Sequence, residues 1–398
     1  MRDAFIEEKI PAYIRDICRR FYEAGEDAYI VGGSLRDIML GRTPNDFDLA
    51  ASALPERTAE LFSDKRVIET GIKHGTVTVI YDGYPIEITT FRIDGSYTDS
   101  RHPDGVCFTG RIEEDLARRD FTVNAMAYND RAGLVDPFGG RVDLDKKIIR
   151  AVGDSRRRFS EDALRIMRAF RFSAQLGFTI DGDTLSGAVD QKRGLSKIAR
   201  ERIAAEFLKL VTSEDAEKVI PLMTKYGILS YITGEYVPNA ETVSLLRQMP
   251  TEAGARLGFF LSDTDEAEAR EILRGLRYSN ALITSAAAVV RGSRFAVNEQ
   301  SDARRLIGNC GVYAKNAAKA SVLRGISDKN SIEWVQENTA PCKLSELSIS
   351  GRDLIAMGFM GRDVGRILNI LLERVMEKPE LNEKNTLTDL AGEYAERT

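Results

Sequence analysis

Histidine and cysteine are scarce in this chain of 398 residues. The two histidines, His74 and His102, are too few for a His-rich metal site or a His-Asp phosphohydrolase domain. The cysteines lie far apart and form no Cys-x-x-Cys pair, which favours buried or idle thiols over disulfides or zinc. They are Cys18, Cys107, Cys310 and Cys342.

Long hydrophobic runs are also missing. Hydrophobic residues make up 43% of the chain, yet no run approaches the about 20 apolar residues of a membrane span. Residues 1–24 mix acids, bases and apolar residues at helical spacing and lack the apolar core of a signal peptide. We therefore expect a helix at the N-terminus, no membrane association and a cytoplasmic location. No internal repeat, low-complexity linker or feature for a protein partner is evident.

Charge is distributed unevenly along the chain. The formal net charge is −5, which by itself argues against a nucleic-acid partner. Residues 150–211, however, carry 13 lysines and arginines against 8 aspartates and glutamates. This basic zone is typical either of a solvated helical surface or of a phosphate-binding stripe, and charge alone does not choose between them.

The first part of the chain alternates short strands and helices. Apolar residues 28–31 predict a strand that ends at a glycine pair, and β-branched residues predict a hairpin around Asp82-Gly83. The other elements expected here are a helix over 35–40, a strand over 46–51, a helix over 56–62, hairpin strands over 76–81 and 85–91, a long polar loop over 91–108 and a helix over 113–127.

Strand patterns almost disappear after residue 160, where helical spacing takes over. We therefore expect an α/β head followed by an all-helical body, with a boundary near Gly153. The clearest helical segments are 163–176, 198–210, 216–226, 266–276 and 367–376.

Two aspartates separated by one residue, Asp46 and Asp48, are the strongest signal of chemistry. Side chains alternate along a strand, so both carboxylates of a strand Asp-x-Asp point to one face. Glu87, between two apolar residues of the hairpin, adds a third carboxylate on a neighbouring strand. Oxygen ligands suit Mg²⁺, and paired ions bridge the reacting oxygens of phosphoryl transfer. The alternatives are an Asp-x-Asp that only shapes a turn and a Glu87 that faces solvent.

The glycine pair Gly32-Gly33 lies between the first strand and a helix start. Successive backbone N–H groups at such a turn, continued by Ser34, form a nest for an anion. Arg36 can reach the same phosphate, and Asp37 is expected to support Arg36 or the loop rather than to bind substrate. The alternative is a glycine pair that simply ends the strand.

Arginine and aspartate recur together in the run Arg118–Ala125. We hypothesise that Arg119 binds a phosphate or a base edge and that Asp120 accepts from a ribose hydroxyl. The alternative is an ordinary helix N-terminus with a solvated face.

A second such run predicts a helix on which Asp162, Arg165 and Arg168 share one face at i, i+3 and i+6. Cytosine and adenine each present an amino donor beside a ring-nitrogen acceptor, which an Asp and an Arg complement. Guanine and uracil present a carbonyl oxygen to the Asp instead, and such a mismatch is strongly discriminating. The pair therefore predicts selection of C and A; the alternative is a surface ion pair of little energetic weight.

Six short motifs in a fixed order resemble those of the class II tRNA nucleotidyltransferases, the CCA-adding enzymes, which are relatives of bacterial poly(A) polymerases. Each is modest alone, but six in this order are specific. They are Gly-Gly-Ser-x-Arg-Asp from residue 32, Asp-Phe-Asp from 46, Glu-Ile-Thr-Thr-Phe-Arg from 87, Arg-Arg-Asp-Phe-Thr-Val-Asn-Ala from 118, Asp-Pro-Phe-Gly-Gly from 136 and Glu-Asp-Ala-Leu-Arg from 161.

The resemblance implies an α+β head, a DNA polymerase beta-like palm with a small mixed sheet, followed by an all-α neck, body and tail. The expected domains are a head over 1–152, a neck over 153–215, a body over 216–330 and a tRNA-binding tail over 331–398. It implies that Asp46, Asp48 and Glu87 are catalytic and bind Mg²⁺. The nucleotide-binding residues that it implies are Gly32, Gly33, Ser34, Arg36, Arg119, Asp120, Asp162, Arg165, Arg168 and Arg171.

The activity implied by the resemblance is template-independent addition of C, C and A to the 3′ end of tRNA, from CTP and ATP, with release of pyrophosphate. An intact loop at residues 97–105 disfavours a CC-only enzyme, and the lack of a longer basic N-terminal segment disfavours a poly(A) polymerase. An A-adding enzyme or poly(A) polymerase is the enzymatic alternative. An inactive RNA-binding protein is the alternative of another class.

Overall fold

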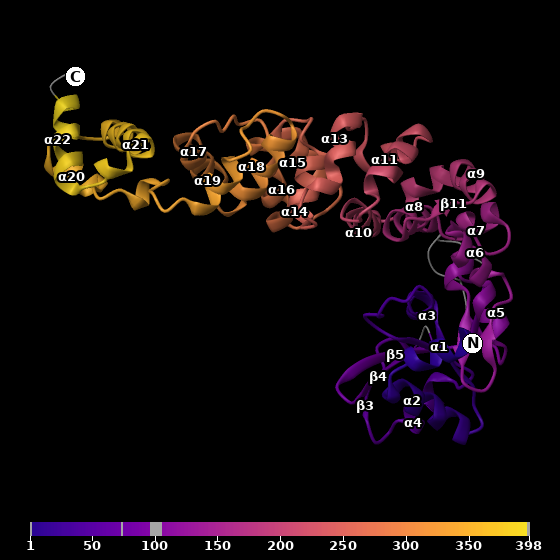
Figure 1. Ribbon diagram of the computed structural model, residues 1–398. Helices are drawn as coiled ribbons and strands as arrows, with labels where there is room; N and C mark the ends of the chain where they lie inside the picture. Colours follow the sequence, from indigo (N-terminus) through magenta and orange to yellow (C-terminus); the bar gives the residue numbers. More distant parts are fainter. Residues whose placement is uncertain (1, 73–74, 96–105, 396–398) are drawn as a thin grey trace. The chain divides into compact units, whose positions relative to one another are not determined.

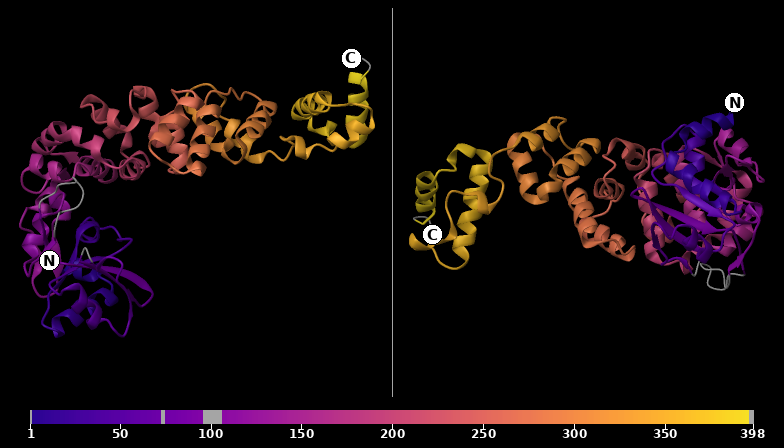
Figure 2. Two further views of the ribbon diagram at one scale, coloured as in Figure 1. Left: turned by 180° about the vertical axis from the view of Figure 1, so that it is seen from behind. Right: turned by 90° about the horizontal axis from the view of Figure 1, so that it is seen from below.

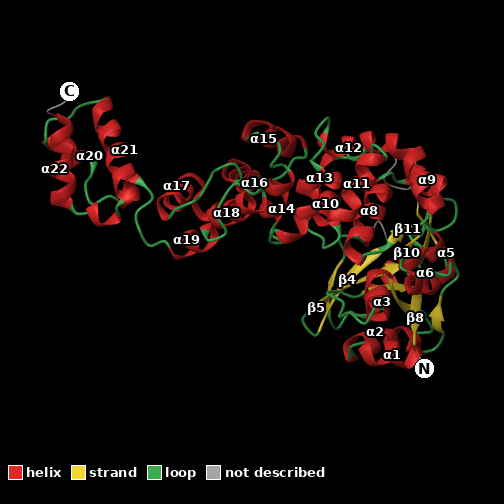
Figure 3. Cartoon of the chain, turned by 45° about the horizontal axis from the view of Figure 1, so that its top comes forward, coloured by secondary structure: helices red, strands yellow, loops and turns green. Residues whose placement is uncertain are grey.

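The computed structural model describes residues 2–72, 75–95 and 106–395. All described strands belong to the first of two compact units (Figure 3), whereas the described part of the second is built from helices and loops (Figures 1 and 2). The first unit comprises residues 1–210 and 225–231, and the second comprises residues 211–224 and 232–398.

A seven-stranded mixed sheet forms the centre of the first unit. Its strand order is β3-β4-β5-β2-β1-β8-β9, in which only β2 and β5 pair in parallel. The strands are β1 (Ala28–Val31), β2 (Asp48–Ala51), β3 (Arg66–Ile68), β4 (Thr76–Tyr81), β5 (Tyr84–Thr90), β8 (Ala127–Asn129) and β9 (Gly133–Val135). Two smaller sheets pair β6 (Arg92–Asp94) with β7 (Val106–Phe108), and β10 (Ile148–Ile149) with β11 (Thr179–Ile180).

The central strands of this sheet explain the positions of the glycine turn and of the carboxylates of Asp48 and Glu87. All four residues of β1 are buried, and β1 lies between antiparallel β2 and β8. The register of β2 and β5 places Asp48 opposite Glu87. Because register partners on neighbouring strands project from the same face of a sheet, both carboxylates leave the same surface.

Most of the predicted head elements are confirmed. The strand over 28–31 has the predicted bounds, and the hairpin turns at Asp82 and Gly83, whose φ angles of 50° and 86° suit a two-residue hairpin loop. The predicted strand over 46–51 begins two residues later, at Asp48. Cys18, Cys310 and Cys342 are buried and free, as expected, whereas Cys107 is exposed.

Two expected elements of the head are wrong. The polar loop over 91–108 is partly strand, because β6 and β7 pair at its ends; residues 97–105 lie outside the described part. The helix over 113–127 is broken into α5, η2 and β8. Its centre is extended because the backbone carbonyl of Asp120 accepts from the N–H of Val152, and the backbone N–H of Thr122 donates to the carbonyl of Arg150. Tertiary pairing overrides the helical pattern there.

A helix occupies each of the helical segments predicted beyond residue 160. Up to residue 225 the helices of the chain are α1 (Arg2–Lys9), α2 (Ala12–Glu23), α3 (Gly32–Met39), α4 (Pro55–Leu61), α5 (Ile112–Ala117), η2 (Thr122–Asn124), α6 (Gly140–Lys146), α7 (Ser155–Glu161), α8 (Leu164–Leu176), α9 (Gly182–Gln191), η3 (Lys192–Lys197), α10 (Arg200–Val211) and α11 (Ala216–Lys225). The longer helices beyond it include α14 (Ala253–Phe260), α15 (Glu266–Gly275), α16 (Asn280–Gly292), α17 (Gln300–Cys310), α18 (Ala314–Leu323), α21 (Arg362–Glu377) and α22 (Lys384–Ala395).

The predicted fold class, a mixed-sheet head followed by helices, is confirmed. Among the described residues beyond 160, only the two-residue β11 is a strand. The division into head, neck, body and tail stays a prediction. No helix in the described ranges has both the length and the apolar character needed to cross a membrane.

Candidate active site

A cavity of about 510 Å³ lies in the first unit, between the glycine turn of the head and the N-terminal half of α8. It brings together residues from segments more than a hundred positions apart. Its lining consists of Gly32, Gly33, Arg36, Asp48, Arg118, Arg119, Asp120, Asn124, Asp162, Leu164, Arg165, Arg168, Phe172 and Arg202.

Nine of the thirteen predicted site residues line this cavity. Ser34, Asp46, Glu87 and Arg171 do not. Ser34 is buried and donates to the carbonyl of Val31, so its side chain holds the turn together. The lining thus joins the predicted phosphate turn and the predicted base-reading residues in one space.

The acidic end of the site is formed by Asp48 with Asp46 and Glu87 nearby. Asp46 lies in a bend before β2, so the strand alternation used to place it beside Asp48 does not apply. The surrounding protein removes part of the water around Asp48, and the charges of Asp46 and Glu87 add to this effect. Together they raise the pKa of Asp48 against the opposing charge of Arg119. The three carboxylates therefore interact electrostatically.

The donor chemistry of this end fits a hard divalent cation. Mg²⁺ is usually held by one or two carboxylates together with substrate phosphates and water, rather than by a complete protein cage. Within the described ranges, no three His, Cys, Asp or Glu side chains are grouped so that they could hold a metal ion by themselves. Asp46 and Asp48 fit such an open site, and a cation beside them would relieve the repulsion that raises the pKa of Asp48.

Gly32 sits where a larger residue would be strained. Its φ of +71° is in the left-handed region, which glycine adopts without a steric penalty. A Cβ atom there would lie 3.1 Å from Nη1 of Arg119 and 3.9 Å from Oδ2 of Asp48. The glycine turn at which α3 begins therefore lies between Arg119 and the acidic end of the cavity.

Arg36 is a buried cation held from two sides. Its Nε donates to Oδ1 of Asp37 at 2.9 Å, as predicted, and its Nη1 donates to Oδ1 of Asn124 at 2.8 Å. Its guanidinium carbon lies 5.2 Å from the centre of the Phe172 ring. These contacts orient the guanidinium toward the same cavity as the glycine turn.

Arg119 is anchored by a fully buried carboxylate. Its Nη2 lies 3.2 Å from Oδ2 of Asp115, whose other oxygen bonds Arg118 at 2.8 Å. Nε of Arg119 is buried without a hydrogen-bond partner. An unsatisfied buried donor is costly, which favours a ligand or water at this position.

Asp120 lines the cavity and is also bonded to protein partners, and its contact with a ribose hydroxyl stays a prediction. Its Oδ2 bonds Arg168 at 2.6 Å, and its Oδ1 accepts from Asn124 and from the backbone of Phe121. Burial favours the neutral acid, but the charge of Arg168 outweighs it, and the pKa of Asp120 falls to about 2. Asp120 therefore fixes Arg168 at the cavity wall.

Asp162, one of the predicted base-reading residues, lies just outside α8 rather than on it. Asp162 is extended, with φ −143° and ψ 105°, and precedes α8, so it does not share a helical face with Arg165 and Arg168. Its Oδ1 accepts from the backbone of Leu164, and its Oδ2 lies 3.0 Å from Nη2 of Arg202. These bonds pull Asp162 out of helical geometry, yet its carboxylate lines the cavity with Arg165.

Arg171 lies behind the cavity wall. Its Nε lies 2.5 Å from Oε2 of Glu206, its Nη1 donates to Gln175, and its guanidinium carbon is 3.8 Å from the Phe172 ring centre. Burial lowers the pKa of Arg171 although Glu206 opposes the change. In this position Arg171 supports Phe172 and, through Glu206, Arg168; its contact with nucleotide stays a prediction.

Five lining residues were not predicted: Arg118, Asn124, Leu164, Phe172 and Arg202. Arg118 and Asn124 belong to the run Arg118–Ala125, so their place beside the predicted Arg119 and Asp120 is a sequence signal that could have identified them. Arg202 comes from α10 and has no local signal, because only its pairing with Asp162 brings it to the cavity. Part of the basic zone therefore lines the cavity and is not solely a solvated surface.

Comparison with known proteins identifies the family. The Poly A polymerase head domain matches residues 28–150, and a putative tRNA nucleotidyltransferase domain 2 matches residues 249–391. The CCA-adding enzyme of Leuconostoc mesenteroides is 37% identical over 95% of both chains, and that of Geobacillus kaustophilus is 34% identical over 93% of this chain and 94% of its own. This chain belongs to the CCA-adding enzymes. It is therefore an enzyme, a tRNA nucleotidyltransferase that adds C, C and A without a template.

Solved structures of CCA-adding enzymes have the same fold. The Bacillus stearothermophilus enzyme in complex with CTP matches 97% of each chain with a TM-score of 0.80 and 29% identity. The Thermotoga maritima enzyme complexed with tRNA matches 98% of each chain with a TM-score of 0.71, and its 21% identity supports the fold alone. The predicted family, activity and tRNA and nucleotide substrates of the CCA-adding enzyme are confirmed, and its family implies a divalent metal.

Proposed function

We propose that the cavity is where this CCA-adding enzyme transfers nucleotides, with the acidic end for chemistry and the α8 end for base choice. The observation that carries the proposal is that Asp48, Asp162 and Arg165 line one space. The cavity spans the glycine turn, which suits phosphates, and the start of α8, where an acceptor and a donor are available for a base edge.

The metal is proposed to be Mg²⁺, held by Asp46 and Asp48 with Glu87 as the third carboxylate. Bound there, Mg²⁺ would neutralise phosphate charge and activate the attacking hydroxyl. The oxygen-only donor set and the raised pKa of Asp48 support this choice.

The protein's own groups position the triphosphate for in-line attack. The backbone N–H groups of the Gly32-Gly33 turn, Arg36 and Arg119 offer donors and positive charge to the phosphates. The tRNA 3′-hydroxyl attacks the α-phosphorus, the bond to the β,γ-diphosphate breaks, and pyrophosphate leaves with that electron pair. Arg168, held by Asp120, adds positive charge to the cavity wall.

Base choice is proposed to lie with Asp162 and Arg165. The carboxylate accepts from the amino group of cytosine or adenine, and the guanidinium donates to the adjacent ring nitrogen. Uracil and guanine would place a carbonyl oxygen against the carboxylate, which leaves two acceptors facing each other in a partly enclosed space. The 14% exposure of the Asp162 side chain supports a substantial penalty for that mismatch.

We expect Asp162→Ala and Arg165→Ala to relax base choice. Loss of one partner removes about 1–3 kcal/mol of discrimination, or about 5- to 150-fold in the ratio of kcat/KM for CTP over UTP and for ATP over GTP. The matched control is the exposed pair Arg156 and Asp190, 2.8 Å apart in the same unit, whose alanine variants should leave both ratios unchanged. Full exclusion of UTP and GTP by the Asp162 and Arg165 variants would contradict the proposal.

One assay tests the reaction itself against the A-adding alternative. The enzyme is given tRNA that ends before CCA or tRNA that ends in CC, each with labelled CTP or ATP alone. We expect CTP incorporation into the first and ATP incorporation into the second. ATP incorporation into the CC-ending tRNA, without any CTP incorporation, would mean an A-adding enzyme. RNA binding without incorporation would support the inactive alternative. The tRNA substrate also supports the proposed cytoplasmic location.

A further inference from the structure

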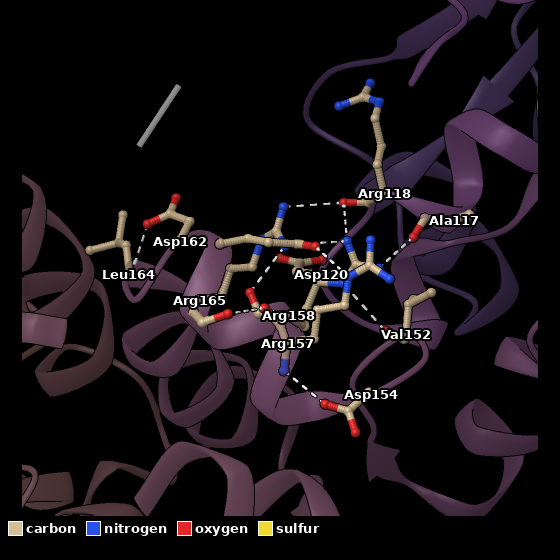
Figure 4. Close-up of polar contacts among 12 residues, drawn as sticks. Ala117, Arg118, Asp120, Val152, Asp154, Arg157, Arg158, Asp162, Leu164 and Arg165 are labelled. Atoms are coloured by element: carbon tan, nitrogen blue, oxygen red, sulfur yellow. Dashed lines mark hydrogen bonds and ion pairs between the residues drawn. The ribbon is translucent and has the colours of Figure 1, made fainter. Parts of the chain in front are cut away.

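We propose that Arg158 is a positioning residue for nucleotide selection, acting on Arg165 through Glu161 and through the backbone of Arg118. This inference rests on the proposed base-reading role of Arg165. Arg158 does not line the cavity and belongs to none of the six motifs, so neither lining nor motif assigns it a role. The contacts that carry the inference are drawn in Figure 4.

Arg165 is held by three hydrogen bonds. Nη1 donates to Oε2 of Glu161 at 2.9 Å and to the carbonyl of Arg158 at 3.2 Å, and Nη2 donates to the carbonyl of Arg118 at 3.2 Å. A guanidinium has five N–H donors in one plane, so these three bonds set the direction of the two that remain. Those two N–H groups can donate to the acceptors on a base edge.

Glu161 couples Arg165 to Arg158. Its Oε2 lies 2.9 Å from Nη1 of each arginine, so one carboxylate oxygen bridges the two guanidinium groups. The side chains of Arg158, Glu161 and Arg165 are 13%, 16% and 11% exposed. Charged hydrogen bonds so shielded from water are stronger and better directed than a surface pair.

Arg158 ties this bridge to the head. Its Nη2 donates to the carbonyl of Ala117 at 2.7 Å, its Nη1 to that of Arg118 at 3.3 Å, and its Nε to that of Val152 at 3.3 Å. Ala117 ends α5, whose unpaired carbonyls attract a cation. Arg158 therefore holds the end of α5 and the chain before α7 at the same time.

The Arg118 carbonyl is the point where this network meets the catalytic segment. It accepts from both Arg158 and Arg165, and the next two residues are Arg119 at the cavity's acidic end and Asp120, which holds Arg168. Loss of Arg158 removes the bonds that fix the Glu161 carboxylate and the Arg118 carbonyl, so two acceptors of the Arg165 guanidinium are no longer held in place. Base choice should then weaken more than the chemical step at Asp48.

The test compares Arg158→Ala and Arg158→Lys in the full-length enzyme. For Arg158→Ala we expect the kcat/KM ratios of CTP over UTP and of ATP over GTP to fall about tenfold, while kcat at saturating CTP changes by less than about threefold. Lysine keeps the charge toward Glu161 but lacks the planar fork for two carbonyls, so its ratios should lie between those of wild type and alanine. Equal loss for all four nucleotides, with unchanged ratios, would overturn the proposal.

The neighbouring Arg157 provides the matched control. Its side chain is 82% exposed and contacts Glu161 only at 3.3 Å, so Arg157→Ala should leave the ratios unchanged. If Arg158→Ala does not fold, Arg158→Lys and Glu161→Gln carry the comparison, and unchanged ratios in both would overturn the proposal.

A double-mutant cycle with Arg165→Ala separates this proposal from the proposed function. If Arg158 acts through Arg165, then Arg158→Ala has no further effect on the ratios once Arg165 is alanine. If Arg158→Ala lowers the kcat/KM ratios as much in the Arg165→Ala background as in the wild-type enzyme, the coupling is refuted, while base reading by Arg165 stands. If Arg165→Ala itself leaves the ratios unchanged, the base-reading function fails and this inference fails with it.

Discussion

Asp48→Asn should reduce kcat by at least about 10³-fold while tRNA affinity changes by less than about twofold. Asparagine preserves the shape of the side chain but removes the negative charge that the proposed Mg²⁺ needs. Burial and then the charges of Asp46 and Glu87 raise the pKa of Asp48, and a cation bound beside these carboxylates would offset their repulsion. Single-turnover incorporation of CMP and a tRNA-binding titration measure the two quantities separately.

A matched aspartate in the same sheet controls for the substitution itself. Asp82, in the hairpin turn between β4 and β5, has a φ of 50°, which asparagine adopts readily, and its side chain is 62% exposed. Asp82→Asn should therefore retain wild-type kcat. Loss of tRNA binding together with turnover in Asp48→Asn would mean that Asp48 supports the fold rather than the chemistry.

Arg168→Ala should destabilise the protein by about 3–5 kcal/mol and Asp120→Ala by less, and the double variant should destabilise it by much less than their sum. Arg168 and Asp120 bond at 2.6 Å with side chains that are 35% and 8% exposed, so Arg168→Ala strands a buried carboxylate, whereas Asp120→Ala leaves a guanidinium that water partly screens. Arg168 would keep the Glu206 carboxylate, which lies 3.9 Å away. Denaturant unfolding of the four proteins gives the coupling energy directly.

The exposed pair Arg19 and Asp16 is a close geometric control. Its atoms also lie 2.6 Å apart, but its side chains are 66% and 41% exposed. Water screens such a pair, so its cycle should give a coupling of no more than about 0.5 kcal/mol. A coupling for Asp120 and Arg168 as small as that of the control would show that the buried bond does not hold Arg168 in place.

The elements that the sequence predicted well are those with a strong local pattern. The hairpin around Asp82-Gly83 is confirmed because both central residues suit its turn, and the helix over 163–176 is confirmed within one residue. The predicted helix over 113–127 is wrong because its middle pairs with residues 150–152, a contact that no local pattern announces. Strand pairing between distant segments is decided by tertiary context rather than by propensity.

The site shows the same division. The motifs that contain Asp48, Arg36 and Arg165 are short runs of neighbouring residues, and together with the other motifs they suffice to predict the family. The place of Asp162 is different: a helical spacing suggested it, but its bonds to Leu164 and Arg202 hold it extended, outside α8. It reaches the cavity for a reason that differs from the predicted one.

The sequence by itself determined the acidic pair, the glycine turn, the Asp and Arg predicted to complement C and A, and the family, because each depends on residue types at short spacing. Only the tertiary structure decided which of these groups share a cavity and which stand behind its wall. It also revealed the partners that aim them: Asp115 for Arg119, Asp120 for Arg168, and Glu161 with Arg158 for Arg165. The physical reason is that a charged side chain buried from water takes its direction from the nearest opposite charge or carbonyl, and folding, rather than spacing along the chain, brings many of those partners close.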